Sequence, residues 1–217
     1  MDLNGKKINI LGDSITEGVG TSGAPYRYID RIADAFGAEC RNYGISGSRI
    51  AMQRVPSANP RFDLYFASRV EQMDADADVV IVFGGTNDFG HGDAPIGCMA
   101  DRTPETFYGA LHDLYTRLIE RYPDKLIVIA TPLHRWNEEN PRGDCKPADV
   151  GTLREYVQII RQVAEWYSLP VLDLFAMSGL QPCLPVHRQR FVPDGLHPND
   201  EGHVILAQKF VSFLRSC

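Results

Sequence analysis

Apolar residues occupy consecutive positions in several short segments of the chain. Three of these segments are KINILG (7–12), DVVIVFGG (78–85) and KLIVIATP (125–132), and all three are rich in valine or isoleucine. Uninterrupted apolar runs of this length are typical of strands that are buried on both faces of a parallel sheet. Two weaker segments of the same kind, AECRNYG (38–44) and LPVLDL (169–174), predict two further strands.

Segments with the period of an amphipathic helix lie between and after these runs. One is predicted to begin at Thr103 and Pro104, because threonine followed by proline is a common helix start. Two others are predicted over 152–167 and about 200–215. The predicted inward faces are Phe107, Leu111, Leu114 and Leu118 in the first helix, Leu153, Tyr156, Val157, Ile160 and Val163 in the second, and Val204, Ala207, Val211 and Leu214 in the third.

Strands that alternate with helices predict right-handed crossovers and a parallel sheet. The length of 217 residues suits one domain, which we place at 1–217. Ligands of such sheets bind beyond the carboxyl ends of the strands. The polar turns GDS (12–14), GGTND (84–88) and TPLHR (131–135) each follow a predicted strand. We therefore expect them to meet at one edge of the sheet.

Composition narrows the class of protein. The chain has 44% hydrophobic and 23% charged residues and a net charge of −6, without a cluster of basic residues, which argues against nucleic acid as a partner. No apolar stretch approaches the roughly 18 residues of a membrane helix, and the N-terminal segment does not read as a signal peptide. The five cysteines are isolated and odd in number, so free thiols, no zinc site and a cytoplasmic location are expected.

Three residues could supply nucleophilic catalysis. Such chemistry needs a hydroxyl, a base that accepts its proton and an acid that orients the base. Ser14, at the end of the first predicted strand, is the candidate hydroxyl, and His197 is the candidate base. Asp194 lies three residues before His197, so one turn of chain can bring its carboxylate to the imidazole Nδ1–H. The pattern predicts a triad of Ser14, His197 and Asp194.

A tetrahedral intermediate also needs donors for its oxyanion. The backbone N–H groups of Ser14 and Gly47 and the side-chain amide of Asn87 are the candidates. Gly47 lies in NYGISGS (42–48) and Asn87 in GGTND (84–88).

These short stretches resemble the signature blocks of the SGNH or GDSL hydrolases. The blocks occur here in order as GDS at 12–14, SG at 46–47, GTND at 85–88 and DGLH at 194–197, and they span nearly the whole chain. The residue after the serine is Ile15 where the family name has leucine, which is a change of packing. The resemblance implies a flavodoxin-like three-layer α/β/α sandwich around a five-stranded parallel sheet.

By the same resemblance, Ser14 is the nucleophile, His197 the base and Asp194 its partner. Gly47 and Asn87 are the oxyanion donors. The family reaction is hydrolysis of carboxylic esters, and it implies no cofactor and no metal.

Several of these residues also have a purely structural interpretation. Ser14 is a suitable helix N-cap, Gly47 suits a turn with positive φ, and Asn87 with Asp88 could form an Asx-turn. We favour a division in which Asn87 donates to the oxyanion and Asp88 braces its loop. Asp13 is expected to brace the serine turn.

Other histidines raise two further possibilities. A metal held by His197 and His203 is disfavoured, because they are not spaced i, i+4 and a metal would compete with the triad for the same nitrogen. His91 and His134 fall on two long polar segments, 89–103 and 131–149, which we interpret as the walls of the substrate site. His134 is thus a candidate substrate-binding residue.

The function predicted from the sequence is hydrolysis of a small acyl ester, most simply an O-acetyl group on a carbohydrate. The polar groups of Trp136, His134 and Arg135 suit a sugar better than a long lipid chain. A lipid or lysophospholipid esterase, or a thioesterase, is the nearest alternative. A flavodoxin-like anion-binding module is the alternative from another class. The predicted partner is a small-molecule ester.

Overall fold

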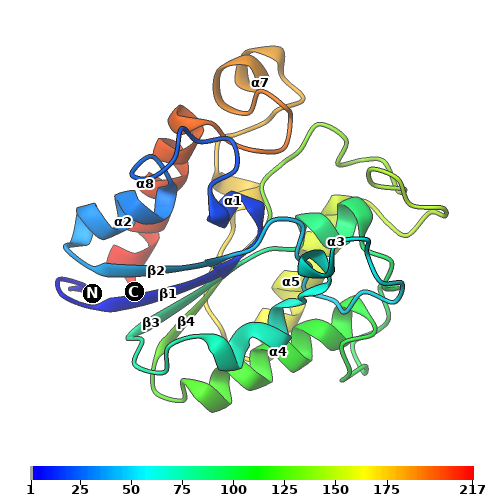
Figure 1. The fold of residues 1–217 in the computed structure, drawn as a ribbon, viewed down its shortest axis with the longest axis horizontal. Coiled ribbons are helices and arrows are strands. Elements are labelled where there is room, and N and C mark those ends of the chain that lie inside the picture. Colours follow the sequence, from blue (N-terminus) through cyan, green and yellow to red (C-terminus); the bar gives the residue numbers. More distant parts are fainter. Residues whose placement is uncertain (1) are drawn as a thin grey trace.

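The computed structural model describes residues 2–217, and its centre is a parallel sheet of five strands in the order β2-β1-β3-β4-β5 (Figure 1). The strands are β1 (Lys7–Gly12), β2 (Glu39–Gly44), β3 (Val79–Phe83), β4 (Leu126–Ala130) and β5 (Val171–Leu172). Gly12 at the end of β1 pairs with Gly44 of β2 and Phe83 of β3. Because these strands end level with one another, the loops that follow them meet at one edge.

Helices cover both faces of the sheet and make a three-layer sandwich (Figure 1). The helices of the upper layer include α2 and α8, and those of the lower layer include α4 and α5. No helix within residues 2–217 is long and apolar enough to cross a membrane. The helical elements are α1 (Ser14–Glu17), α2 (Tyr28–Phe36), η1 (Pro60–Asp63), η2 (Phe66–Gln72), α3 (Thr86–His91), α4 (Phe107–Arg121), α5 (Leu153–Trp166), α6 (Leu174–Met177), α7 (Pro185–Phe191) and α8 (Asp200–Ser216).

The two layers enclose two hydrophobic cores. Successive side chains of a strand point to opposite faces. In β3, Val80 and Val82 therefore belong to the core under α4 and α5, whereas Val79, Ile81 and Phe83 belong to the core under α2 and α8. All five are buried. This explains why the strand reads as an unbroken apolar run rather than an alternating one.

The predicted strands are confirmed, with one change in length. β5 pairs with β4 only through Val171 and Leu172, although the apolar segment was expected to run from 169 to 174. The strand ends early because Asp173 caps α6, with its carboxylate accepting from the N–H of Ala176 at 3.2 Å.

The start of α4 differs from the prediction. The N-cap is Thr106 rather than Thr103, and its hydroxyl oxygen accepts a hydrogen bond from the N–H of Gly109 at 3.1 Å. The same hydroxyl donates to Asp101 at 2.8 Å. These bonds hold the chain before Thr106 in a loop. The apolar face predicted for α4, and that for α5, are both buried.

The inward face of α8 is rotated from the prediction. Val204 and Val211 are only half-buried, whereas the ring of Phe210 is fully buried and stacks on Tyr28 of α2 at 5.0 Å between ring centroids. The buried residues of α8 are Gly202, His203, Leu206, Ala207, Phe210 and Leu214. Packing against α2 therefore sets the orientation of α8, which the apolar pattern alone left ambiguous.

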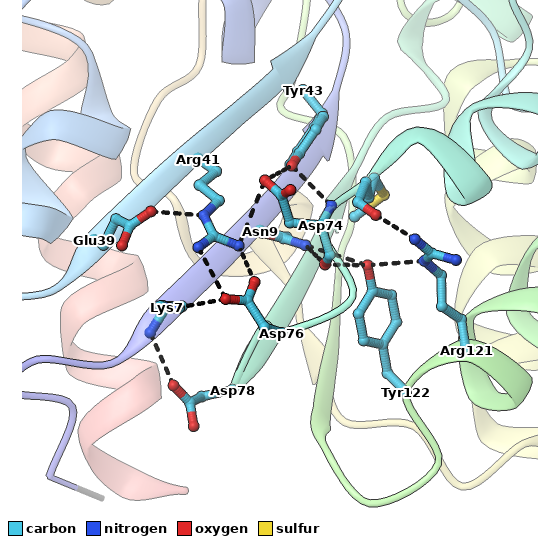
Figure 2. A network of polar contacts seen from close by, with 11 residues as sticks. Lys7, Asn9, Glu39, Arg41, Tyr43, Asp74, Asp76, Asp78, Arg121 and Tyr122 are labelled. Carbon is cyan, nitrogen blue, oxygen red and sulfur yellow. Dashed lines mark hydrogen bonds and ion pairs between the residues drawn. The ribbon is translucent and has the colours of Figure 1, made fainter.

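A polar network occupies the edge of the sheet where the strands begin (Figure 2). Arg41 of β2 donates to Asp76 at 2.5 Å, and the side chain of Lys7 also bonds Asp76. The backbone N–H of Lys7 donates to Asp78 at 2.9 Å. These largely exposed ion pairs each contribute little to stability. They join β1 and β2 to the segment before β3, at the end of the sheet opposite the polar turns.

Candidate active site

Ser14 is the first residue of α1, and only Asp13 separates it from the end of β1. Gly12 permits the close turn, because a Cβ atom there would lie 2.0 Å from Thr16 Oγ1. The N-cap of α1 is Asp13, not Ser14, and its carboxylate accepts from the N–H of Ile15 at 3.0 Å. Burial raises the pKa of Asp13 to about 6 despite this bond. Asp13 thus braces the turn, and the hydroxyl of Ser14 is left for another partner.

That partner is His197. Ser14 Oγ lies 2.9 Å from His197 Nε2, and His197 Nδ1 lies 2.6 Å from Asp194 Oδ2. The structure thus brings together the three residues of the expected triad.

Asp194 is fixed by the loop that carries His197. Its Oδ1 atom accepts from the backbone N–H groups of Leu196 at 2.8 Å and His197 at 2.7 Å, which leaves Oδ2 for the imidazole. Burial alone would raise the pKa of Asp194, but the hydrogen bonds from His197 and Leu196 outweigh it and lower the pKa to about 2. The carboxylate is therefore ionised across the neutral and mildly acidic range.

The loop after β2 brings Gly47 to the same edge. Gly47 has φ of +74°, and a Cβ atom there would lie 2.9 Å from the ring of Phe62, so glycine is required for both reasons. The neighbouring Ser46 is held by Glu17 of α1, whose carboxylate accepts from the Ser46 N–H at 2.6 Å. The Gly47 loop is thereby attached to the helix that carries Ser14.

Asn87 and Asp88 lie in α3, just after β3. Asn87 Nδ2 donates to the carbonyl oxygen of Ser48 at 2.9 Å. The carboxylate of Asp88 accepts from the N–H groups of Ile50 at 2.9 Å and Ala51 at 2.8 Å. Asp88 therefore braces the segment after Gly47, and the alternative of an Asx-turn does not hold because both residues are helical.

Three donors remain available at this edge. Within residues 2–217, the backbone N–H groups of Ser14 and Gly47 donate to no other atom. Asn87 Nδ2 carries two protons and uses one for Ser48. These are the three groups expected to bind an oxyanion.

Arg69 is a structural residue of the site that the sequence reading missed. Its guanidinium is buried and donates to the carbonyl oxygens of Tyr43 at 2.7 Å and Gly12 at 3.1 Å, and to Ser48 Oγ at 3.1 Å. It therefore clamps the ends of β1 and β2 to the Gly47 loop. The available signal was a basic residue among the buried apolar positions of η2.

The 131–149 segment contains no helix or strand, as predicted, but two of its polar side chains are bound internally. His134 Nδ1 lies 2.8 Å from Glu138, and its ring lies 3.9 Å from that of Phe175. Arg135 is buried and donates to Asp144 at 2.5 Å. Arg135 thus braces the segment, and contact between His134 and a substrate stays a prediction.

Unlike His134 and Arg135, Trp136 is 52% exposed, and it lies beside the loop that carries Asp194 and His197. Its backbone N–H donates to the carbonyl oxygen of Gly195 at 2.9 Å, and a Cβ atom on Gly195 would lie 2.6 Å from the indole. A surface cavity of about 360 Å³ lies between Trp136 and residues of α7, among them Arg188 and Gln189. An aromatic face and hydrogen-bonding groups therefore line a cavity next to the Asp194–His197 loop.

Two further histidines lie outside the triad and contact other parts of the protein. His203 Nδ1 accepts from the backbone N–H of Tyr28 at 3.0 Å. His91, expected in a loop, is the last residue of α3, so the loop begins at Gly92. Among the described residues there is no group of three or more histidine, cysteine, aspartate or glutamate side chains placed to hold a metal. All five cysteines are free thiols, as expected.

Residues 10–205 match the GDSL-like Lipase/Acylhydrolase family, and the chain belongs to this family. The fold and the arrangement of Ser14, His197 and Asp194 agree with that membership. The protein is thus a carboxylic ester hydrolase. No curated protein sequence matches the chain.

Solved structures share the fold over the whole chain. A protein from Lactobacillus plantarum is 32% identical, with 99% of this chain and 98% of that chain covered and a TM-score of 0.83. The lipase/acylhydrolase from Enterococcus faecalis is 21% identical, with coverages of 97% and 96% and a TM-score of 0.66. An acetyl xylan esterase is 23% identical, with coverages of 95% and 98% and a TM-score of 0.64.

Proposed function

We propose that the protein is a serine esterase that removes short acyl groups, O-acetyl above all, from carbohydrates. The observation that carries the catalytic part is the continuous chain of hydrogen-bond distances from Ser14 Oγ through His197 to Asp194. In this arrangement the hydroxyl has a base within reach, and the base has an ionised partner that orients it.

The reaction runs in two halves. Ser14 Oγ attacks the ester carbonyl carbon while His197 Nε2 takes the hydroxyl proton. The tetrahedral intermediate then collapses, the bond to the alcohol oxygen breaks, and His197 returns the proton to that oxygen. A water molecule attacks the acyl-enzyme in the same way, with His197 as base. Hydrolysis of the acyl-enzyme releases the carboxylic acid and regenerates the Ser14 hydroxyl.

The negative charge that develops on the carbonyl oxygen is met by the N–H groups of Ser14 and Gly47 and by Asn87 Nδ2. Donors fixed before the reaction stabilise the transition state more than the ground state. Arg69, Asp88 and Glu17 hold the loops that carry these donors.

The carbohydrate part of the proposal rests on Trp136. An exposed indole can stack on the face of a sugar ring, and Arg188 and Gln189 in the adjoining cavity can bond ring hydroxyls. The proposal is also supported by a solved structure of this fold that is described as an acetyl xylan esterase. The free thiols of the chain support a reducing, cytoplasmic setting.

The test compares acyl length and alcohol in one panel. We expect kcat/KM to fall from acetyl to octanoyl p-nitrophenyl esters, and acetylated xylo-oligosaccharides to be hydrolysed faster than simple alkyl acetates. A preference for octanoyl of tenfold or more would replace the carbohydrate proposal with the lipid alternative. A preference for acyl thioesters would favour the thioesterase alternative. Failure of a fluorophosphonate probe to label the protein would favour the anion-binding alternative.

Substitution of Trp136 isolates the sugar contact. Trp136→Ala should raise KM for the acetylated oligosaccharide several-fold and leave hydrolysis of p-nitrophenyl acetate nearly unchanged. Trp166→Ala is the matched control, because Trp166 is also exposed (57%) but lies at the end of α5. Equal effects of the two substitutions would remove the support that Trp136 gives.

A further inference from the structure

A chain of three side chains leads from the protein interior to Asn87. Arg49 Nη2 lies 2.8 Å from His91 Nδ1, and His91 Nε2 lies 3.1 Å from Asn87 Oδ1. Asn87 and His91 are one helical turn apart on α3, so their side chains share a face. The side chain of Arg49 is almost completely buried.

The chemistry of Arg49 determines where the protons of this chain lie. A guanidinium only donates, so His91 Nδ1 must accept. A neutral imidazole that accepts at Nδ1 carries its hydrogen on Nε2 and donates it to Asn87 Oδ1. Burial, and then the positive charge of Arg49, lower the pKa of His91 to about 4 and keep the ring neutral at physiological pH.

These contacts leave the Asn87 amide only one orientation. Its oxygen faces the Nε2–H of His91, and its nitrogen faces the carbonyl oxygen of Ser48. A flipped amide would place its oxygen against the Ser48 carbonyl and its NH₂ against a donor. The second proton of Nδ2 is thus the one that remains for an oxyanion.

We propose that His91, held by Arg49, is a positioning residue that fixes the Asn87 amide with its NH₂ group toward the oxyanion. This inference rests on the proposed esterase function and deepens it. His91 touches no reacting atom and acts through Asn87. The contribution of Asn87 to catalysis therefore depends on an imidazole one turn further along α3.

The same chain also reaches the Gly47 loop. Arg49 Nη1 donates to the carbonyl oxygen of Phe62 at 2.9 Å, and the ring of Phe62 lies in the space that a Cβ atom on Gly47 would enter. Arg49 therefore holds His91 with one nitrogen and the support of Gly47 with another. Two of the three oxyanion donors are braced by this one buried guanidinium.

A cavity beside His91 allows a test by chemical rescue of a variant that lacks the imidazole ring. The cavity has a volume of about 300 Å³, and His91 lines it together with Arg54, Lys146 and several apolar residues. Free imidazole can enter a space of this size and replace a missing ring.

The central experiment replaces His91 with two amide side chains that differ in length by one methylene group. His91→Gln places an amide N–H near the position of Nε2 and should keep kcat within a few-fold of the original protein. In His91→Asn the shorter amide reaches Arg49 but cannot donate to Asn87. We expect kcat to fall about tenfold to hundredfold, with KM nearly unchanged. This loss is smaller than the about 10²–10³-fold loss in kcat that follows removal of a whole oxyanion donor. A kcat for His91→Asn equal to that for His91→Gln would overturn the proposal.

Rescue gives a second readout. Imidazole in the millimolar range should raise kcat of His91→Ala several-fold and leave Asn87→Ala unchanged. His112→Ala is the matched control, since it deletes another buried imidazole, in α4, and should lose stability without loss of kcat or response to imidazole. If His91→Ala does not fold, the comparison of His91→Gln with His91→Asn still decides the question.

A double-mutant cycle distinguishes a role of His91 that is exerted through Asn87 from a general effect of His91 on the structure. In the Asn87→Ala background, His91→Asn should cause no further loss of kcat. Independent, multiplicative losses would contradict the proposed role. The two proposals fail in different ways. If the esterase mechanism is wrong, Ser14→Ala keeps its activity. If only the role of His91 is wrong, Ser14→Ala is inactive and His91→Asn is unimpaired.

Discussion

His197 Nε2 lies 2.9 Å from Ser14 Oγ, although 183 positions of the sequence separate the two residues. The first strand delivers the hydroxyl, and the loop before the last helix delivers the imidazole. This contact lies at the carboxyl edge of the sheet, where β1 and β3 end level.

Removal of the nucleophile should abolish activity. We expect Ser14→Ala to lower kcat by more than about 10⁴-fold and to prevent labelling by a fluorophosphonate probe. The fold should survive, because the Ser14 side chain serves no cap and, within residues 2–217, its hydroxyl contacts only His197 as a hydrogen-bond partner. Circular dichroism and thermal unfolding provide the control. Retention of most of the activity would rule out the proposed mechanism.

The base and its partner should differ in their effects. His197→Ala removes the proton acceptor and should cost about 10⁶-fold in kcat, whereas Asp194→Asn keeps the base but loses its orientation and should cost about 10⁴-fold. Steady-state kinetics on p-nitrophenyl acetate measure both. An Asp194→Asn variant as impaired as His197→Ala would contradict the division of roles.

Asn87 should act on the transition state. Asn87→Ala removes one oxyanion donor, so kcat should fall about 10²–10³-fold with little change in KM. Asn87→Asp, which places a carboxylate at the same position, should be more severely impaired because it repels the developing charge. A change confined to KM would instead make Asn87 a substrate-binding residue.

His203 makes stability depend on pH. Burial lowers its pKa from 6.5 to about 4, so between these values the unfolded chain binds a proton that the folded chain does not. Stability contributed by the neutral ring is therefore present above pH 6.5 and is lost as the pH falls toward 4. His203→Asn keeps an acceptor for the Tyr28 N–H but does not titrate.

Urea unfolding at pH 7 and pH 4.5 measures this difference. Between the two pH values, the original protein should lose about 2 kcal/mol more stability than His203→Asn. Asp13, Asp88 and His91 titrate in both proteins, so the comparison isolates His203. Parallel losses in the two proteins would show that His203 is not responsible.

The sequence was most informative where one local rule determines the structure. The run VVIVF is buried on both faces and forms the central strand β3, and the spacing of Asp194 and His197 lets one turn join them. It was less informative where a local choice depends on distant residues. The start of α4 is set by Asp101, and the rotation of α8 by Tyr28, and neither partner can be read from the helix itself.

The supports of the site were the least predictable part. Arg69 contacts Gly12, Tyr43 and Ser48, which lie 57, 26 and 21 positions away. His91 was recognised only as a polar residue near the site, because nothing in its own segment indicates that Arg49 would fix its tautomer. Long-range hydrogen bonds of this kind leave no periodic pattern in the sequence.

Because a chain is synthesised from its N-terminus, Ser14 is made long before His197. A nascent chain that has emerged through β4 already carries Ser14, Gly47 and Asn87, but it has no base. The loop with Asp194 and His197 lies directly before α8, which packs against α2 through Phe210 and Tyr28, so the base is the last member of the triad to be synthesised. Until that loop is in place, Ser14 has no base within reach and is an ordinary hydroxyl that does not attack esters.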